Sequence, residues 1–205
     1  MTSPRPAAAP HQLAGPGDLN YAEVGASTTP GQPLPAGYNH LRHRALIGHG
    51  RAALDAAGEA VLGWRMHRAA GVRISTDAER ATPGAAVRCA IGLGPLRAAA
   101  PCRVVRTTEA DDTADGTTDG TGRPDRYGFT YGTRRGHLAV GEETFLVEMG
   151  ADKAVWFTVN AFSRPRSWYA HLAGPLLPLG QRLFARLCAR ALTRIAAAAT
   201  AAAGS

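Results

Sequence analysis

A carboxylate and an imidazole lie close together in residues 126–149, the segment with the densest group of side chains that could transfer protons. His137 stands in a glycine-rich connection, and Glu143 follows it in an alternating run. Burial raises the pKa of a glutamate toward neutrality, and histidine already titrates near neutrality. The two side chains could therefore act as general acid and base. The alternative is structural: Glu143 pairs with an arginine and His137 caps the turn.

The residues on either side of His137 predict two strands, because apolar side chains recur at every second position. The first strand has an aromatic face made of Tyr127, Phe129 and Tyr131. In the second strand, Glu143 shares a face with Phe145, so an inward-facing Phe145 would bring the carboxylate inward with it. Glu142 then points the other way, and we expect it at the surface. The aromatic face either lines a pocket for a flat or apolar molecule or packs as ordinary core.

Further candidate ligand-binding residues are Phe145 and Phe157 within strands, Thr133 and Ser163 near strand ends, and Arg164 and Trp168 at the start of the final helical region. Arg164 stands where the last strand gives way to the final helix. It could hold a carboxylate or phosphate of a ligand, or it could neutralise Glu143. Thr133 and Ser163 are potential hydrogen-bond donors. Neither lies in a GxSxG nucleophile motif.

Histidine and cysteine spacing gives no support for a metal site or another cofactor. His40 and His43 would point to opposite faces of a strand, and no acidic residue completes a ligand set with His49 or His67. The three cysteines are far apart and form no CxxC motif: Cys89, Cys102 and Cys188. We expect them to be small buried residues in a reducing cytoplasm.

The chain has 205 residues, enough for one domain, and 45% of them are hydrophobic, so a core can form. The net charge is +7, and Lys153 is the only lysine. The arginines are scattered, which disfavours nucleic-acid binding. They recur every fourth residue only in the last helix, at Arg182, Arg186, Arg190 and Arg194. This basic ridge is either a solvated face or a docking surface for an acidic partner.

We expect one domain with variable ends. Residues 1–18 are rich in proline, alanine and glycine and predict a disordered tail. Residues 19–199 form the domain, 107–125 form a mobile acidic loop inside it, and 200–205 fray. No segment has the roughly 20 apolar residues of a membrane span, and the N-terminus lacks a signal-peptide core.

The order of predicted elements is one strand, one helix, about six strands and a long C-terminal helix. The helices are expected at 51–64 and 181–199, the latter with a buried stripe that includes Leu183 and Phe184. Pro165 is expected near a helix start. Short connections favour antiparallel pairing, and an antiparallel sheet with one apolar face needs a helical cover. The sequence therefore predicts an α+β helix-grip fold, with a curved sheet of six or seven strands around the C-terminal helix.

Successive blocks of the chain resemble a family of actinobacterial and plant proteins, the domain of unknown function numbered nineteen-ninety. The blocks are 19–25, 34–38, 48–54, 63–71, 94–105, 128–145 and 155–165. The most specific are YGTRRGH with GEETF in the sixth and AFSRP in the last. The resemblance covers 19–192 and implies membership and a helix-grip fold, as in pollen-allergen-like, START-like and polyketide-cyclase-like proteins. It implies no activity.

Two functions follow from these observations. The first is a carrier or sensor that binds a small hydrophobic or polyketide-like molecule between sheet and helix. The second is an enzyme on the same scaffold, a cyclase, dehydratase or isomerase of secondary metabolism, in which Glu143 and His137 transfer protons. An adaptor that uses the basic ridge is a weaker third hypothesis.

Overall fold

The computed structural model describes residues 17–93, 96–109, 125–166 and 176–204. The strands are β1 (Asn39–His49), β2 (Arg73–Thr76), β3 (Ala86–Leu93), β4 (Leu96–Glu109), β5 (Arg126–Thr133), β6 (Ala139–Met149) and β7 (Ala154–Pro165). The helices are α1 (Gly50–Leu62), α2 (Arg65–Ala69) and α4 (Leu176–Ala203). The expected order of elements is confirmed, except that a second, short helix, α2, follows α1.

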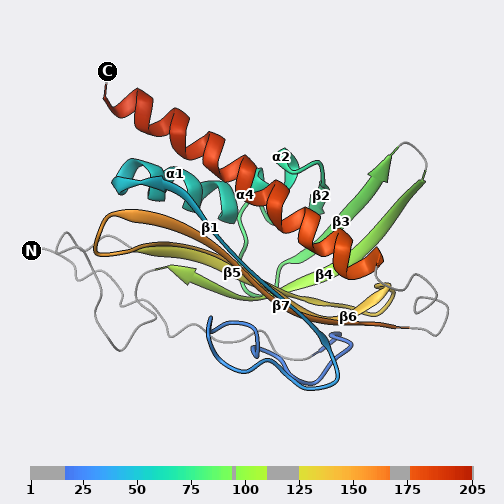
Figure 1. The fold of residues 1–205 in the computed structure, drawn as a ribbon. Coiled ribbons are helices and arrows are strands. Elements are labelled where there is room, and N and C mark those ends of the chain that lie inside the picture. The colour runs from blue at the N-terminus through green and yellow to red at the C-terminus, as the bar shows by residue number, and fades with distance from the viewer. Residues whose placement is uncertain (1–16, 94–95, 110–124, 167–175, 205) are drawn as a thin grey trace, which may run out of the picture.

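All seven strands form one antiparallel sheet in the order β1-β7-β6-β5-β4-β3-β2. The three helices cover one face, and the N-terminal segment 17–38 loops across the other face (Figure 1). We call these the inner face and the outer face, and we call residues 17–38 the arm. The long helix α4 crosses the inner face and packs mainly on α1 and β1. This arrangement confirms the predicted helix-grip fold.

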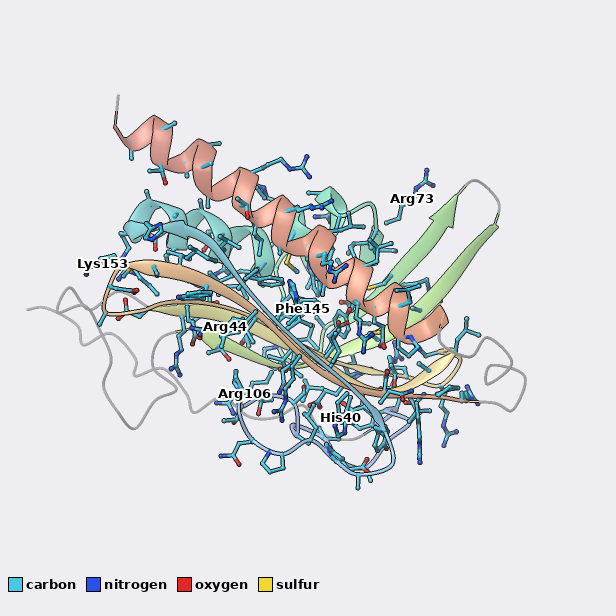
Figure 2. All side chains as sticks on the ribbon, in the orientation of Figure 1. His40, Arg44, Arg73, Arg106, Phe145 and Lys153 are labelled. Atoms are coloured by element: carbon cyan, nitrogen blue, oxygen red, sulfur yellow. The ribbon has the colours of Figure 1, made fainter. Side chains whose placement is uncertain are left out.

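The inner face holds an aromatic core. Phe145 lies between the sheet and α4 (Figure 2), and it is completely buried. Its ring contacts Phe129 at a centroid distance of 5.5 Å and Phe157 at 6.4 Å. Trp64, at the end of α1, closes this cluster with a contact of 4.9 Å to Phe129. The alternation of β5, β6 and β7 sends these rings to one face, so the period-two pattern decides the core.

The outer face is buried as well, which the sequence did not predict. Glu142 is only 3% exposed, so its expected surface position is wrong. Its carboxylate accepts four hydrogen bonds from the arm: from Tyr21 Oη (2.8 Å), Gly25 N (2.7 Å), Ser27 N (2.8 Å) and Ser27 Oγ (2.7 Å). A buried carboxylate is tolerated when its lone pairs are satisfied in this way.

Two expectations for the C-terminal region are wrong. Pro165 does not start a helix; it ends β7, where it pairs with Ala139. Leu183 is 55% exposed, because the buried face of α4 is made of Ala185, Cys188, Leu192 and Ala196. The helix is continuous from Leu176 through Pro178, which the first turn tolerates because its N–H groups lack helical partners. All four arginines of the basic ridge are exposed.

Parts of the expected domain plan lie outside the described residues, namely 1–16 and most of the acidic loop. Asp18 lies within the described part and pairs with Arg103 and Arg134. At the other end, α4 extends to Ala203. No helix in the described part of the chain is both long enough and apolar enough to cross a membrane.

Gly58 and Gly180 give the first testable prediction. A Cβ at Gly58 of α1 would lie 2.4 Å from the Tyr127 ring, whereas a Cβ at Gly180 of α4 would meet nothing within 4 Å. Alanine favours helix by about 1 kcal/mol, but overpacking costs about 1–3 kcal/mol. We expect Gly58→Ala to lower the free energy of unfolding by about 1–2 kcal/mol and Gly180→Ala to raise it by about 0.5–1 kcal/mol. Urea denaturation measures both, and equal effects would contradict the packing of Tyr127 on α1.

Glu142 gives a second prediction. Glu142→Gln replaces two acceptor oxygens by one and turns an amide toward arm donors, so we expect a loss of about 2–4 kcal/mol in unfolding free energy. We also expect faster proteolysis within the arm. The control is Glu148→Gln, because Glu148 pairs with Arg44 and Arg126 at 3.7 and 3.6 Å near the surface and such pairs contribute about 0–1 kcal/mol. An arm that stays protected in Glu142→Gln would show that this carboxylate does not hold it.

Candidate functional site

Glu143 is the centre of the candidate site. It lies on the inner face of β6, opposite Tyr131 of β5. Tyr131 Oη donates a hydrogen bond to Glu143 Oε2 at 3.0 Å, while Oε1 is buried and has no partner among the described residues. Burial raises the pKa of Glu143 to about 7 and outweighs the opposing effect of the Tyr131 hydrogen bond. This carboxyl group can therefore gain or lose a proton near neutral pH.

His67 is a second buried polar group beside the same residues. It comes from α2 and is completely buried, with its ring centroid 4.8 Å from Phe145, 5.7 Å from Phe184 and 6.0 Å from Tyr131. Neither ring nitrogen has a partner in the described part of the chain. Burial lowers the pKa of His67 to about 3, and Arg68 adds to the effect. The imidazole is therefore neutral at physiological pH.

In the sequence, His67 stands out only as a candidate metal ligand, so its position beside Tyr131 and Phe145 was not predicted. The residues around it carry a weak signal, because Trp64 and Met66 mark an apolar segment. What the spacing could not show is the left-handed conformation of Trp64, with φ of 63°. That residue separates α1 from the short α2, and α2 then directs His67 into the interior.

The three cysteines are all free and buried. A hydrogen bond to Cys89 and burial raise the pKa of Cys102 well above its usual value. Burial likewise raises the pKa of Cys188, and the Glu143 carboxylate raises it further. The thiols of Cys102 and Cys188 are therefore protonated, and both lie near enough to Glu143 to feel its charge.

His137 and Glu143 are not joined by a hydrogen bond among the described residues. His137 lies in the turn between β5 and β6, where its Nδ1 accepts the N–H of Ala139 at 2.8 Å. Burial lowers the pKa of His137. The group that the structure brings to Glu143 is Tyr131.

The other candidate residues divide between the two faces. Phe129, Phe145 and Phe157 lie in the inner core. Ser163 ends the inner face and accepts a hydrogen bond from Gln181 of α4 at 3.0 Å. Arg164, one residue later, lies on the outer face with its guanidinium 4.7 Å from the Tyr38 ring.

The remaining candidates are Tyr127 and Thr133, at the two ends of β5, and Trp168. Tyr127 packs on α1 and donates to Asp55 at 3.1 Å. Thr133 bonds to Asn20 of the arm and to the backbone of Gly141. Trp168 lies outside the described residues.

Access to the site is uneven. Phe145, Phe157 and His67 have no exposed surface, so no water-sized space lies beside them. Glu143, Phe184 and Gln181 are half-buried. Of these six residues, only Glu143, Phe184 and Gln181 keep some exposed surface, and the Oε1 atom of Glu143 is itself buried. Within the described ranges, no three His, Cys, Asp or Glu side chains are grouped so that they could hold a metal ion.

Glu143 and His67 predict opposite pH dependences of stability. Glu143 keeps its proton to about pH 7 when folded but ionises near 4.5 when unfolded, so its effect lowers stability as pH rises through this range. His67 stays neutral to about pH 3 when folded but is protonated below 6.5 when unfolded, so its effect lowers stability as pH falls. The maximum effects are roughly 3 kcal/mol for Glu143 and roughly 4–5 kcal/mol for His67.

Two variants separate these effects. We expect the difference in unfolding free energy between Glu143→Gln and wild type to move in favour of the variant as pH rises from about 4 to 8. For His67→Phe, the difference should move in favour of the variant as pH falls from about 7 to 4. Urea denaturation across this pH range measures both. A Glu143→Gln difference that does not change with pH would show that the carboxyl group ionises in the folded protein as it does in water.

Comparison with known proteins places the chain in a family. The model of the family described as Domain of unknown function (DUF1990) matches residues 20–191. A UPF0548 protein from Deinococcus radiodurans is 52% identical over 73 residues, which cover 36% of this chain and 37% of that protein. A UPF0548 protein from Arabidopsis thaliana is 35% identical over 71 residues, or 35% of each chain. The matches thus span little more than a third of these relatives.

Two solved structures share the fold at 8% identity. A hypothetical protein from Helicobacter pylori has a TM-score of 0.58, with 96% of this chain and 99% of that chain covered. A norcoclaurine synthase mutant from Thalictrum flavum, in complex with a transition-state analogue, has a TM-score of 0.52, with 80% and 97% covered. At this identity the likeness concerns the fold alone. Since the family model spans most of the chain, this protein belongs to the DUF1990 family, as the resemblance of its sequence blocks implied.

Proposed function

We propose that this protein is a carrier or sensor that binds a small hydrophobic molecule between the sheet and the first half of α4. The apolar part of the molecule lies against Phe184 and the aromatic core. A polar atom of the molecule bonds to Glu143 and Tyr131. The free thiols fit a reducing cytoplasm as the setting.

The observation that carries the proposal is the unpartnered oxygen of Glu143. Buried polar atoms almost always have hydrogen-bond partners, and an exception asks for an explanation. Glu143 Oε1 is such an exception, in an interior whose other residues are mainly apolar, with His67 as the second buried group that lacks a partner among the described residues. Ligand sites have this composition: an apolar lining with a few convergent polar groups.

The packing of α4 indicates where room for a guest is available. Ala185, Cys188 and Leu192 are completely or almost completely buried, so this part of the helix is fixed on α1 and β1. Phe184 is only half-buried, although it faces inward and contacts the Phe145 ring at 6.3 Å. A guest that displaces the Phe184 ring would reach Glu143 without moving the helix.

The fold is compatible with this function and with the enzymatic alternative. The norcoclaurine synthase structure holds a transition-state analogue, so the same fold is used by an enzyme. Catalysis by Glu143 in this protein remains a prediction. The acidic partner of the basic ridge likewise remains a prediction.

Binding of the neutral fluorescent probe N-phenyl-1-naphthylamine tests the site. We expect Phe184→Ala to tighten the binding about fivefold or more, because the probe no longer has to displace a ring. Leu183→Ala is the matched control, since Leu183 is the next residue of α4 but faces solvent. Glutamine at position 143 keeps an acceptor oxygen and His137 does not bond to Glu143, so for a carrier Glu143→Gln and His137→Ala should change the affinity little.

Equal probe binding by Phe184→Ala and Leu183→Ala would contradict the proposed position of the guest. Native mass spectrometry of protein purified from its own host is then the direct search for a co-purified molecule. If that molecule is converted to a product, loss of a general acid or base in Glu143→Gln should slow the conversion about 10²–10⁴-fold. Unchanged conversion would exclude the enzymatic alternative that uses Glu143.

A further inference from the structure

The outer face contains a groove that is separate from the helix-covered interior. Its volume is about 750 Å³, and the arm, the turn between β5 and β6, and the ends of β6 and β7 form its walls. Three of its lining residues are Arg135, Arg164 and Arg166. Arg135 comes from the turn between β5 and β6, Arg164 from the end of β7 and Arg166 from the residue after β7. The fold therefore brings all three to the same groove.

None of these three guanidinium groups has an ion pair or hydrogen bond among the described residues, whereas their neighbours do. Arg134, next to Arg135, pairs with Asp18 of the arm. Arg103 pairs with the same aspartate at 3.0 Å. The two arginines near the arm are thus paired with an acidic residue, whereas those that face the groove have no ion pair among the described residues.

The groove is held in shape by the arm. Asn20 N donates to Thr133 O at 3.1 Å, and Leu19 forms a bridge with Arg134. Tyr38 stacks on Arg164 and donates its hydroxyl to Glu23 at 2.9 Å. The backbone N–H of Arg166 donates to Leu138 O at 3.0 Å, which fixes its main chain while the guanidinium stays exposed.

The charges at the groove favour a dianion. Three guanidiniums and the Glu23 carboxylate give the lining a charge of +2. A phosphate monoester carries about −1.5 to −2 at pH 7 and offers three acceptor oxygens, which suit planar guanidinium donors. The volume exceeds that of phosphate alone, and Leu19, Val140 and Tyr38 supply apolar surface for an attached group.

We propose that this groove is a binding site for an organic phosphate, with the phosphoryl group on Arg135, Arg164 and Arg166. Arg164 thus contacts an anion, as the sequence suggested, but on the face opposite the expected cavity. The site does not depend on the guest proposed for the interior.

Isothermal titration with phenyl phosphate at low ionic strength tests the site. We expect saturable binding to the wild type and about tenfold weaker binding when any one of Arg135, Arg164 or Arg166 becomes glutamine, because each removes a charge-assisted contact. The triple variant should not bind. Arg182→Gln on α4 is the control: it removes an equally exposed charge from the other face and should leave the affinity within about twofold.

Benzoate provides a test of the charge argument, because it has the same ring and a single charge, and we expect it to bind at least about tenfold more weakly than phenyl phosphate. Arg135 and Arg166 are exposed, so their variants should melt like the wild type, whereas Arg164→Gln and the triple variant also lose the contact with the Tyr38 ring and should melt slightly lower. Phenyl phosphate that binds the triple variant as well as the wild type, or that does not bind the wild type at about 10 mM, overturns the proposal. Equal affinity for benzoate overturns the phosphoryl assignment.

Phosphatidylcholine vesicles with and without a phosphoinositide distinguish the source of the phosphoryl group. Sedimentation that requires the phosphoinositide and is lost in the triple variant would assign the site to a lipid headgroup. Absence of sedimentation together with phenyl phosphate binding would assign it to a soluble organic phosphate. N-phenyl-1-naphthylamine should bind the triple variant normally, so failure of one site is distinguishable from failure of the other.

Discussion

Strand alternation forces the two neighbouring carboxylates of β6 to opposite faces of the sheet, and both faces are covered. Glu142 meets the arm and receives four hydrogen bonds. Glu143 meets the aromatic core and receives one, from Tyr131. A one-residue change of register would turn Glu142 away from its hydrogen-bond donors on the arm and toward the aromatic core. The register of β6 therefore decides both how the arm is held and which carboxylate has an oxygen without a hydrogen-bond partner among the described residues.

The inner face combines tight packing with incomplete polar satisfaction. His67 and Glu143 are both held in uncharged or readily neutralised forms by burial. An aliphatic or aromatic residue at either position would avoid this desolvation cost. Their positions on different elements, α2 and β6, converge on Tyr131, and packing alone does not explain why two such groups meet there. This convergence distinguishes the region near the start of α4 from the rest of the core.

Strand and helix content followed from the sequence because each element is defined by local periodicity. The aromatic alternation of 127–131 and the apolar face of 143–147 needed no tertiary information. The environment of Glu142 did need it, since the covering arm lies more than 100 residues away in the chain. The phase of α4 was also ambiguous: alanine and cysteine form its buried face, and the larger Leu183 is exposed. Small residues give a weak periodic signal, although they are what allows α4 to lie close to α1 and β1.

The part of the candidate site that follows from local strand periodicity was predicted from the sequence. Alternation placed Glu143, Tyr131 and the phenylalanines on one face, which a single strand pair determines. His137 was chosen because it is near Glu143 in sequence, but a turn residue can satisfy its own backbone, and this one bonds to Ala139. The inward position of His67 depends on the left-handed conformation of Trp64, which the sequence does not show. The position of Arg164 could be predicted only once it was known that Ser163 faces α4. Because side chains alternate along β7, Arg164 faces the arm on the outer face. The same alternation therefore keeps the inner face apolar and places the basic groove on the opposite side of the sheet.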